Sequence, residues 1–258
     1  MGNRTSVGIV VPTLGNRDLM LKECLTSLRV ENVFIALVGP KSLSKSPLVE
    51  MADVVFDDEN ASLPAAINLA ISQLPEHIHY VSWLGDDDQI VSGAIRLQEE
   101  LLNESSSVVA TYGQCRYIDL DGNELGVQRS GKFALSLLQW GPNLIPQPGG
   151  LFRRATWLEL GGLDENYSQA FDTDFYLRIS KKGEVRYLPH ILANYRWHDQ
   201  ALSVGNRWKS VLESSRARKR NSLNPLITNF VLDWFVRIAT MLAGRVLSFS
   251  LSKRRRKS

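Results

Sequence analysis

Short apolar runs alternate with stretches of helical spacing over the first 105 residues, and this alternation limits the possible folds most strongly. The apolar runs are rich in β-branched residues and are typical of buried strands over residues 6–11, 33–38, 53–56 and 79–84. The residue spacing between them predicts helices over 16–28, 64–73 and 92–102. Strands and helices that alternate in this way indicate an α/β fold with a central, mostly parallel sheet flanked by helices.

The pattern changes after residue 105, where strand signals follow one another directly. We expect paired strands over 108–112 and 114–119, and Asp121-Gly122 is a turn that could start a hairpin. Further along the chain, the spacing predicts helices near 133–140, 154–160 and 173–181 and short strands near 184–188 and 191–197. The length of 258 residues fits one large domain with an appendage.

The net charge of +3 conceals two parts of opposite sign. Residues 1–206 hold 17 Lys and Arg against 25 Asp and Glu, a balance of −8, whereas residues 207–258 hold 13 against 2, a balance of +11. The acidic body argues against a nucleic-acid-binding protein, and the basic tail favours a polyanionic partner. We therefore expect a body over residues 1–205 and a basic, helical extension over 206–258.

The extension contains a largely apolar segment, residues 226–251, which charged residues interrupt. A membrane-spanning helix needs about 20 mostly apolar residues, and the longest uncharged run after Arg237 is shorter than that. Polar or small residues recur at three- or four-residue spacing at Asn229, Asp233, Arg237, Thr240, Gly244 and Ser248. An opposing apolar stripe consists of Phe235, Ile238, Leu242, Val246 and Phe249. This pattern predicts an amphipathic helix.

The basic run Lys253 to Lys257 at the end of this segment favours a helix that lies in an anionic membrane surface. The alternative is a C-terminal helix that packs on the body or on a dimer partner and leaves a solvated basic tip. The oligomeric state stays open. Cys24 and Cys115 are too few for a disulfide framework, and we find no secretory signal before the first strand. We therefore expect a cytoplasmic protein, peripheral on the inner face of the cell membrane.

Several common site motifs are missing from this sequence. The first predicted strand is followed by PTLGNRD, which is not the glycine-rich loop of dinucleotide-binding proteins. The chain contains neither a P-loop nor a nucleophile elbow. The two cysteines and four histidines lack the spacing of zinc ligands. Classical dinucleotide, P-loop, hydrolase and zinc sites therefore lose their main support.

Three consecutive carboxylates, Asp86 to Asp88, follow the fourth predicted strand in the segment WLGDDD. Like charges this close destabilise a site unless a cation neutralises them. Because Mg²⁺ often binds one or two carboxylates plus substrate phosphates, the cluster could bind a metal that holds a diphosphate. The alternative is an acidic turn that caps the next helix near its positive end. The spacing alone does not separate the two interpretations.

A second acidic pair and a histidine lie further along the chain. Asp172 and Asp174 could occupy the start of a helix, where carboxylates are favourable, or one of them could be a general base. Arg196 and His198 alternate near the end of a short strand, so both could face a phosphate or a metal. A lone histidine is more often structural than a ligand.

Taken together and in this order, these segments resemble the family 2 inverting glycosyltransferases over roughly residues 6–204. VGIVVPTLGNRDLMLKECLTSL is similar to the opening strand, Pro-Thr turn and helix of the family, and NASLPAAINLAI to its Asn-rich segment. WLGDDD resembles the Asp-x-Asp region, and QPGGLFRRATWLELGGLDENY the acceptor-side segment. FDTDFYLRI resembles the base-bearing segment, and YRWHDQALS the closing element. Each segment is a weak signal alone, but six in the right order are specific.

The resemblance implies a GT-A-type fold, with a nucleotide-binding half over about 1–105 and an acceptor half over about 106–205. It implies transfer of a sugar, of the hexosyltransferase type, from a nucleoside-diphosphate donor to an acceptor hydroxyl with inversion. Asp172 would be the general base. Asp87, Asp88 and His198 would bind a divalent cation, Mg²⁺ or Mn²⁺. The nucleotide-sugar would contact Pro12, Thr13, Arg17, Asn68, Asp86, Gly149 and Gly150.

Two departures from the family pattern leave the nucleobase open. Gly85 stands where the first acid of the Asp-x-Asp motif is expected, and VGPKS after the second strand lacks acidic residues. Asp57 and Asp58 could partly substitute, or they could form an exposed acidic loop. Two other functions remain: a non-catalytic nucleotide- or carbohydrate-binding module on the same fold, and a nucleotidyltransferase. The sugar, the linkage and the acceptor, such as a lipid-linked glycan or a cell-surface polysaccharide precursor, also stay open.

Overall fold

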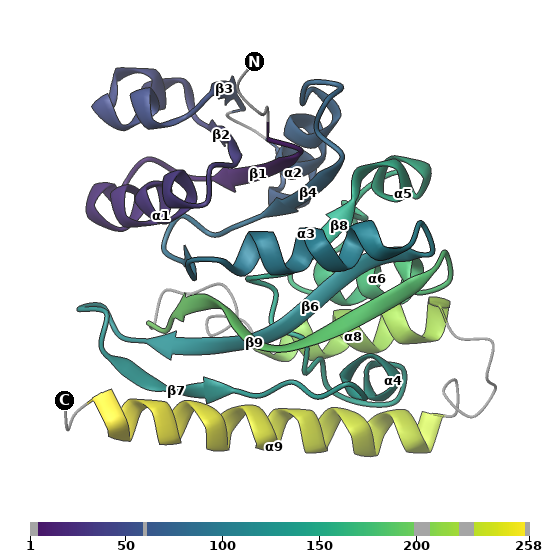
Figure 1. Cartoon of the computed structure of the whole chain (residues 1–258). Helices are drawn as coiled ribbons and strands as arrows, with labels where there is room; N and C mark the ends of the chain where they lie inside the picture. Colours follow the sequence, from purple (N-terminus) through teal and green to yellow (C-terminus); the bar gives the residue numbers. More distant parts are fainter. Residues whose placement is uncertain (1–4, 59–60, 199–206, 222–229, 256–258) are drawn as a thin grey trace.

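The computed structural model describes residues 5–58, 61–198, 207–221 and 230–255, and it shows a mixed sheet between layers of helices (Figure 1). The strand order is β3-β2-β1-β4-β8-β6-β9-β5, and β7 pairs with β6 beside this path. The predicted α/β fold with a central sheet flanked by helices is confirmed.

The first half of the sheet is parallel, as the alternation of strands and helices predicted. Its strands are β1 (Val7–Pro12), β2 (Phe34–Gly39), β3 (Val54–Asp57) and β4 (Tyr80–Trp83). The connecting helices are α1 (Asp18–Val30) and α2 (Leu63–Ser72), and two short 3₁₀ helices cover Lys41–Lys45 and Pro47–Met51. The carboxyl ends of β1 and β4 lie side by side, because Val10 is in register with Trp83. The loops that follow these two strands are therefore neighbours.

The second half of the sheet mixes parallel and antiparallel pairs. The strands are β5 (Gln89–Ile90), β6 (Val108–Ile118), β7 (Glu124–Gln128), β8 (Leu151–Arg153) and β9 (Glu184–Arg196). β6 runs parallel to β9 and antiparallel to β7 and β8, while β8 joins the two halves by pairing with β4. The hairpin predicted at Asp121-Gly122 is confirmed, because Ile118 pairs with Glu124 across it.

Two predicted strand breaks are wrong. The expected break at Gly113 lies inside β6, where the missing side chain lets β9 approach: a Cβ there would sit 2.5 Å from Leu192 Cδ1. The expected break around Pro189 lies inside β9, where the register with β6 shifts between Tyr112 and Gln114. A glycine at a close approach and a bulge both interrupt the sequence pattern of a strand without ending it.

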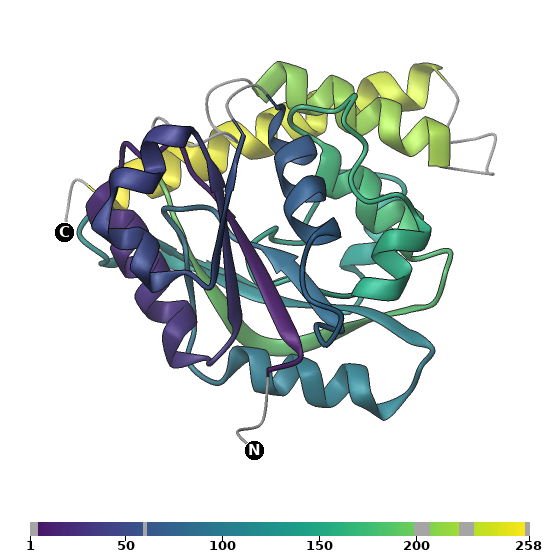
Figure 2. The same cartoon turned by 90° about the horizontal axis from the view of Figure 1, so that it is seen from above.

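Helices cover both faces of the sheet and bury two apolar clusters (Figure 2). Successive residues of β1 point to opposite faces, so Val10 belongs to one cluster and Ile9 and Val11 to the other. α1 and α3 (Ala94–Glu104) pack on one face. α2, α4 (Ala134–Leu138), α5 (Arg154–Glu159) and α6 (Phe171–Ile179) pack on the other.

The extension forms two helices that lie against the body. α8 (Arg207–Asn221) packs on α6, and α9 (Phe230–Arg255) packs on α8 and β7 (Figure 1). The amphipathic helix predicted over 226–251 is therefore observed from Phe230 onward, and residues 226–229 lie outside the described part. Among the described helices, none is both long and apolar enough to cross a membrane.

Candidate functional site

The acid cluster Asp86–Asp88 lies directly beside the loop that follows β1. Thr13 Oγ1 donates a hydrogen bond to Asp86 Oδ2 at 2.6 Å, and Arg17 Nη1 lies 3.3 Å from Asp86 Oδ1. Thr13 Oγ1 also accepts from the backbone N–H of Gly15 at 3.0 Å. The parallel pairing of β1 and β4 explains this meeting, because it brings the carboxyl ends of both strands to one edge of the sheet.

Asp87 brings together two of the predicted site residues. Its Oδ2 lies 2.7 Å from Arg17 Nη1 and 2.8 Å from His198 Nε2, so both groups share one carboxylate oxygen. His198 is buried and follows the end of β9, and it lies 111 positions after Asp87 in the sequence. His198 therefore lies beside the acid cluster, and its predicted role as a metal ligand stays a prediction.

Asp88 is turned into the protein rather than toward His198. Its Oδ1 accepts from the backbone N–H of Arg196 at 2.9 Å, and the residue is buried. Arg196 is also buried, and its guanidinium donates to the carbonyl oxygens of Asp87, Asp119 and Leu120 and to the carboxylate of Glu23. Arg196 therefore holds the loops around the cluster in place. The expectation that it faces a ligand beside His198 is wrong, since all these partners are protein groups.

Burial and mutual repulsion raise the pKa values of two acids in the cluster. Desolvation is the largest cause of the raised pKa of Asp86, and hydrogen bonds from Thr13 and Arg17 oppose it. The pKa of Asp88 is raised well above its usual value by burial and then by the charge of Asp87. A bound cation would lower both values, because it favours the charged carboxylates.

The helix-capping alternative for these acids is wrong. The next helix, α3, starts after Gly93, and the carboxylate of Glu31 accepts from the backbone N–H groups of Gly93 and Ile95 at 2.7 and 3.1 Å. Glu31 therefore occupies the position near the positive helix end that the acid cluster would have filled. The orientation of the cluster toward Thr13, Arg17 and His198 needs another explanation.

The donor set fits a cation held jointly with a substrate. No group of three or more His, Cys, Asp and Glu side chains in the described residues could hold a metal by itself. Asp87 Oδ2 and His198 Nε2 offer two ligands 2.8 Å apart, and Mg²⁺ commonly completes its shell with phosphate oxygens and water. The Arg17 guanidinium lies on the same oxygen, so a metal at Asp87 would compete with Arg17.

Asp172 lies in the first turn of α6. Its hydrogen-bond partners among the described residues are neutral groups. Its Oδ1 accepts from the backbone N–H of Thr173 at 2.6 Å, and its Oδ2 accepts from Asn143 Nδ2 at 3.1 Å. Desolvation raises its pKa to about 6, and these hydrogen bonds limit the rise. The side chain is only partly buried. A carboxylate with this pKa is a stronger base than ordinary Asp and is still ionised at neutral pH.

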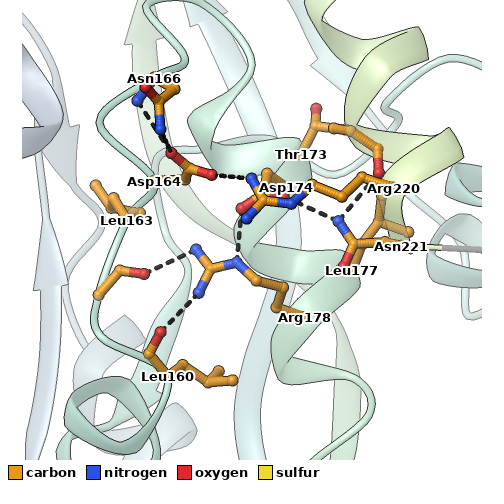
Figure 3. Close-up of polar contacts among 12 residues, drawn as sticks. Leu160, Leu163, Asp164, Asn166, Thr173, Asp174, Leu177, Arg178, Arg220 and Asn221 are labelled. Carbon is orange, nitrogen blue, oxygen red and sulfur yellow. Dashed lines mark hydrogen bonds and ion pairs between the residues drawn. The ribbon is translucent and has the colours of Figure 1, made fainter.

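Asp174, two residues further along the same turn, is fully buried and compensated (Figure 3). Arg178 Nε lies 2.6 Å from its Oδ2, and Asn221 Nδ2 donates to its Oδ1 at 2.9 Å. Arg178 also donates to the carbonyl oxygens of Leu160 and Gly162. Asp174 therefore links α6, α8 and the loop after α5, which makes Asp172 the better candidate for a base.

Aromatic packing connects Asp172 with the acid cluster. The ring of Phe171, next to Asp172, lies 6.0 Å from the ring of Trp83, which ends β4 three residues before Asp86. Gln147 Nε2 donates to the carbonyl oxygen of Trp83 at 3.0 Å. The loop that leads to the two predicted glycines and the residue before Asp172 therefore both contact Trp83 at the end of β4.

Gly149 and Gly150 fill positions that a side chain could not occupy. Gly149 has φ +87°, and a Cβ there would lie 2.9 Å from Leu192 Cβ. A Cβ at Gly150 would clash with the hydroxyl of Tyr176. That hydroxyl is buried and has no hydrogen-bond partner among the described residues. Close packing against the protein accounts for both glycines, and their predicted contact with the donor sugar stays a prediction.

Asn68 lies away from the acid cluster and clamps a turn. Its Nδ2 donates to the carbonyl oxygen of Leu163 at 2.9 Å, and its Oδ1 accepts from the N–H of the same residue at 2.8 Å. The neighbouring Gly162 leaves the space that this amide fills. Pro12 ends β1 directly before Thr13. Among the predicted nucleotide-sugar residues, Thr13, Arg17 and Asp86 form one cluster, whereas Asn68 supports the loop after α5.

The sequence did not reveal that the extension braces the predicted base. The carboxylate of Glu213, on α8, accepts from the backbone N–H groups of Ser168, Gln169 and Ala170 at 3.0, 2.7 and 3.1 Å. These amides directly precede α6. Arg218 Nη1 donates to the carbonyl oxygen of Gly141 at 2.9 Å, in the loop that carries the Asp172 partner Asn143. The single acid within the basic stretch 207–221 was the available sequence signal.

Comparisons with solved structures identify proteins that share this fold. Residues 1–349 of TarS from S. aureus, in complex with UDP, match with a TM-score of 0.61 and 14% identity over 85% of this chain and 66% of that one. The mannosyltransferase PcManGT from Pyrobaculum calidifontis, in complex with GDP-Man and Mn²⁺, matches with a TM-score of 0.61 and 14% identity over 95% and 76%.

A longer TarS structure has a TM-score of 0.57 and 14% identity over 82% of this chain, which spans 39% of its length. No protein-family model matches the sequence. A search of curated proteins found no match either. At this level of identity, the matches show a shared α/β fold.

Proposed function

We propose that the protein transfers a sugar from a nucleoside-diphosphate donor to an acceptor hydroxyl, as a family 2 inverting glycosyltransferase of the hexosyltransferase type. One observation carries the proposal: Asp86 and Asp87 meet Thr13, Arg17 and His198 at the carboxyl ends of β1 and β4. Ligands of open α/β sheets bind at such strand ends. Asp172, a carboxylate with a raised pKa, directly follows Phe171, whose ring packs on Trp83 at the end of β4.

The donor would lie over the loop after β1. Pro12, Thr13 and Arg17 are placed to contact the nucleotide, and Asp86 is placed to accept hydrogen bonds from ribose hydroxyls. The structures that share the fold support a nucleotide-sugar, since TarS was solved with UDP and UDP-GlcNAc and PcManGT with GDP-Man. These ligands differ in nucleobase and sugar, so we leave both unassigned.

A divalent cation, Mg²⁺ or Mn²⁺, would be held by Asp87 and His198 together with the donor phosphates. When bound, it would neutralise negative charge on the departing nucleoside diphosphate. Arg17, released from Asp87, could then reach the same phosphates. Asp88 would support this site indirectly, because it accepts a hydrogen bond from the backbone N–H of Arg196, two residues before His198. The Mn²⁺ in the PcManGT structure supports this assignment.

Asp172 would accept the proton of the acceptor hydroxyl as the new glycosidic bond forms. A single displacement at the anomeric carbon inverts its configuration, and no covalent intermediate with the protein is needed. Asn143 and the backbone N–H of Thr173 hold the two carboxylate oxygens, so the base is oriented before the acceptor arrives. Gly149 and Gly150 would let the backbone approach the donor sugar or the acceptor.

The acceptor in this proposal is a lipid-linked glycan or a precursor of a cell-surface polysaccharide, and the protein would be peripheral on the inner face of the cell membrane. The basic extension supports this location, since its balance of +11 contrasts with −8 for residues 1–206. Anionic lipids attract such basic segments.

The proposal can be tested by a thermal-shift screen of UDP-, GDP- and dTDP-sugars with and without Mn²⁺, followed by product analysis. We expect one donor class to stabilise the protein more in the presence of Mn²⁺, and slow transfer to water to release a nucleoside diphosphate and a sugar of inverted configuration. Formation of a nucleoside triphosphate and a sugar 1-phosphate when pyrophosphate is added to the same donors would instead indicate a nucleotidyltransferase. Binding without turnover in the presence of acceptor lipids would indicate a binding module.

A matched variant tests the metal assignment in the same screen. Asp87→Ala removes the carboxylate that His198 and Arg17 share, so the Mn²⁺-dependent part of the donor shift should be lost. Asp121→Ala, at an exposed position in the turn between β6 and β7, is the control for removing one carboxylate. An unchanged Mn²⁺ response in Asp87→Ala would contradict the assignment.

A further inference from the structure

α9 packs on the protein through its polar face. An ordinary surface helix turns its apolar face toward the core instead. Asp233 is buried; it accepts a hydrogen bond from Ser215 and pairs with Arg237 and with Lys219, whose Nζ lies 2.8 Å from Asp233 Oδ2. One face of α9 is therefore committed to α8 through charges and hydrogen bonds. Gly244, further along the same face, lies against the Arg207 side chain.

The opposite face of α9 exposes large apolar side chains. The exposed fractions are 53% for Trp234, 60% for Phe235, 38% for Ile238, 54% for Leu242 and 73% for Phe249. Their spacing of three, four and seven residues places Phe235, Ile238, Leu242 and Phe249 in one row, which extends over about 20 Å at 1.5 Å per residue. We call these four side chains, together with the adjacent Trp234, the outer row. A contiguous apolar surface of this kind marks an interaction site.

We propose that the outer row is a docking surface for a lipid bilayer that contains anionic lipids. A helix that lies in a membrane interface combines an apolar, aromatic face with basic residues that contact the headgroups. α9 has this combination, because the exposed Arg245 lies beside the outer row and the basic run Lys253 to Lys257 follows it in sequence. Trp234, with an apolar ring and a polar N–H, is suited to the headgroup region.

Charge separates a bilayer from the other obvious occupant, a second copy of the chain. Residues 207–258 carry a balance of +11. Two copies that met through the outer row would bring two such extensions together, and like charges at an interface oppose association. An anionic bilayer has the opposite sign and attracts each basic residue near its surface. The charge distribution therefore favours lipid.

Docking through α9 would bring the candidate site near the membrane. Near the C-terminal end of α9, Arg254 Nη1 donates to the carbonyl oxygen of Leu125 at 2.8 Å. Leu125 packs with Trp197, which directly precedes the Asp87 partner His198. In Figure 1, β9 ends on the side of the molecule where α9 ends. If the proposed function holds, a membrane-linked acceptor hydroxyl would reach the site from this side.

A vesicle-flotation experiment tests the docking surface with the full chain. The probes are vesicles of phosphatidylcholine alone and of phosphatidylcholine mixed with phosphatidylglycerol. We expect flotation with the mixed vesicles, and a partition coefficient at least about tenfold lower for the variant Phe235→Ser/Leu242→Ser/Phe249→Ser, because each substitution removes apolar area that the bilayer would bury. These side chains are exposed, so the thermal midpoint should stay unchanged.

The matched control removes three equally exposed apolar side chains elsewhere. Phe133, Leu137 and Leu158 are 64%, 49% and 49% exposed, and Phe133→Ser/Leu137→Ser/Leu158→Ser should float like the parent protein. Equal flotation of the α9 variant and the parent, or equal loss in both variants, would overturn the proposal. A dimer in sedimentation without lipid that the α9 variant dissociates would also overturn it, in favour of a second copy.

The assay separates the docking surface from the proposed function. Flotation requires no donor and no catalysis, whereas the nucleotide-sugar thermal shift requires no membrane. Flotation that depends on the outer row supports docking even if no donor binds. If a nucleotide-sugar raises the thermal midpoint but the protein does not bind anionic vesicles, docking is refuted and the proposed function is not.

Discussion

Asp172 and Asp174 lie on one turn of α6, yet the protein treats their charges in opposite ways. Asp174 is fully buried and its carboxylate is matched by Arg178 at 2.6 Å and by Asn221. Asp172 receives hydrogen bonds from neutral groups, Asn143 and the backbone of Thr173, and burial raises its pKa to about 6. A compensated acid fixes the fold, whereas an acid left without a cation is ready to accept a proton.

The acid cluster after β4 follows the same logic as Asp172. Asp86 and Asp87 share one guanidinium, that of Arg17, and burial raises the pKa values of Asp86 and Asp88. Three adjacent carboxylates with so few cationic partners concentrate negative charge at the candidate site. Elsewhere, buried acids such as Asp174 and Asp233 have cationic partners.

The largest expected effect comes from removing the uncompensated acid of α6. Asp172→Asn keeps the shape and one of the two accepted hydrogen bonds but removes the base, so the transfer rate should fall by about 10²–10⁴-fold. Donor binding, measured by thermal shift, should be retained. If Asp172→Asn transferred sugar at the parental rate, Asp172 would not be the base and the contrast with Asp174 would lose its functional meaning.

Removing the compensated acid should instead destabilise the protein. Asp174→Asn leaves the half-buried Arg178 without its charge partner, and breaking a buried ion pair costs up to about 3–5 kcal/mol in the free energy of unfolding. Denaturant unfolding measures this change, with Asp172→Asn as the matched control. A smaller loss for Asp174→Asn than for Asp172→Asn would reverse the assignment of structural and reactive acids.

Removing the contact between Glu213 on α8 and the residues before α6 should have a smaller effect, on both the free energy of unfolding and kcat. Glu213→Ala leaves the buried amides before α6 without an acceptor, which costs about 1–3 kcal/mol. Because these amides lead directly to Asp172, kcat should also fall while the KM for the donor stays constant. Glu213→Gln keeps one acceptor oxygen and should recover part of both. A loss of stability without any loss of kcat would restrict Glu213 to a structural role.

The pH dependence sharpens the comparison with the smallest expected change. Asp172 must be ionised to act, so kcat/KM should fall through an acid limb near pH 6, by about tenfold per unit below it. The raised pKa also has a consequence for stability. The folded state binds the Asp172 proton more tightly than the unfolded state, so ionisation of this group destabilises the folded state above about pH 6. The destabilisation disappears as the pH falls toward the ordinary pKa of an Asp side chain.

Measurement of unfolding at pH 5 and pH 7 in the parent and in Asp172→Asn isolates this contribution. The parent should lose stability relative to the variant as the pH rises from 5 to 7. An acid limb near pH 4 would show that burial does not perturb Asp172 in solution.

The sequence pattern predicted the elements whose contacts are local or repetitive. The four parallel strands and the turn at Asp121-Gly122 both follow from short-range rules. Gly113 was misleading because its strand depends on the distant Leu192, which needs the space that a side chain would fill.

The candidate site was predictable where the residues follow strand ends, and less so where it depends on long-range contacts. Thr13 and Asp86 could be paired in advance because parallel strands bring their ends together. The contact of Glu213 with residues 168–170 joins positions about 45 apart and has no local signal. The pattern of α9 showed two faces, but only the structure shows which face is turned inward.

The position of Glu213 has a practical consequence for the design of a shorter fragment of the chain. A fragment cut at residue 205 would match the boundary suggested by the resemblance, but it would lack the acceptor for the amides before α6 and the Asn221 partner of Asp174. The loop that carries Asn143 would also lose the arginine that holds Gly141. A shorter fragment should therefore include α8, because the body keeps these contacts only when the first helix of the extension stays with it.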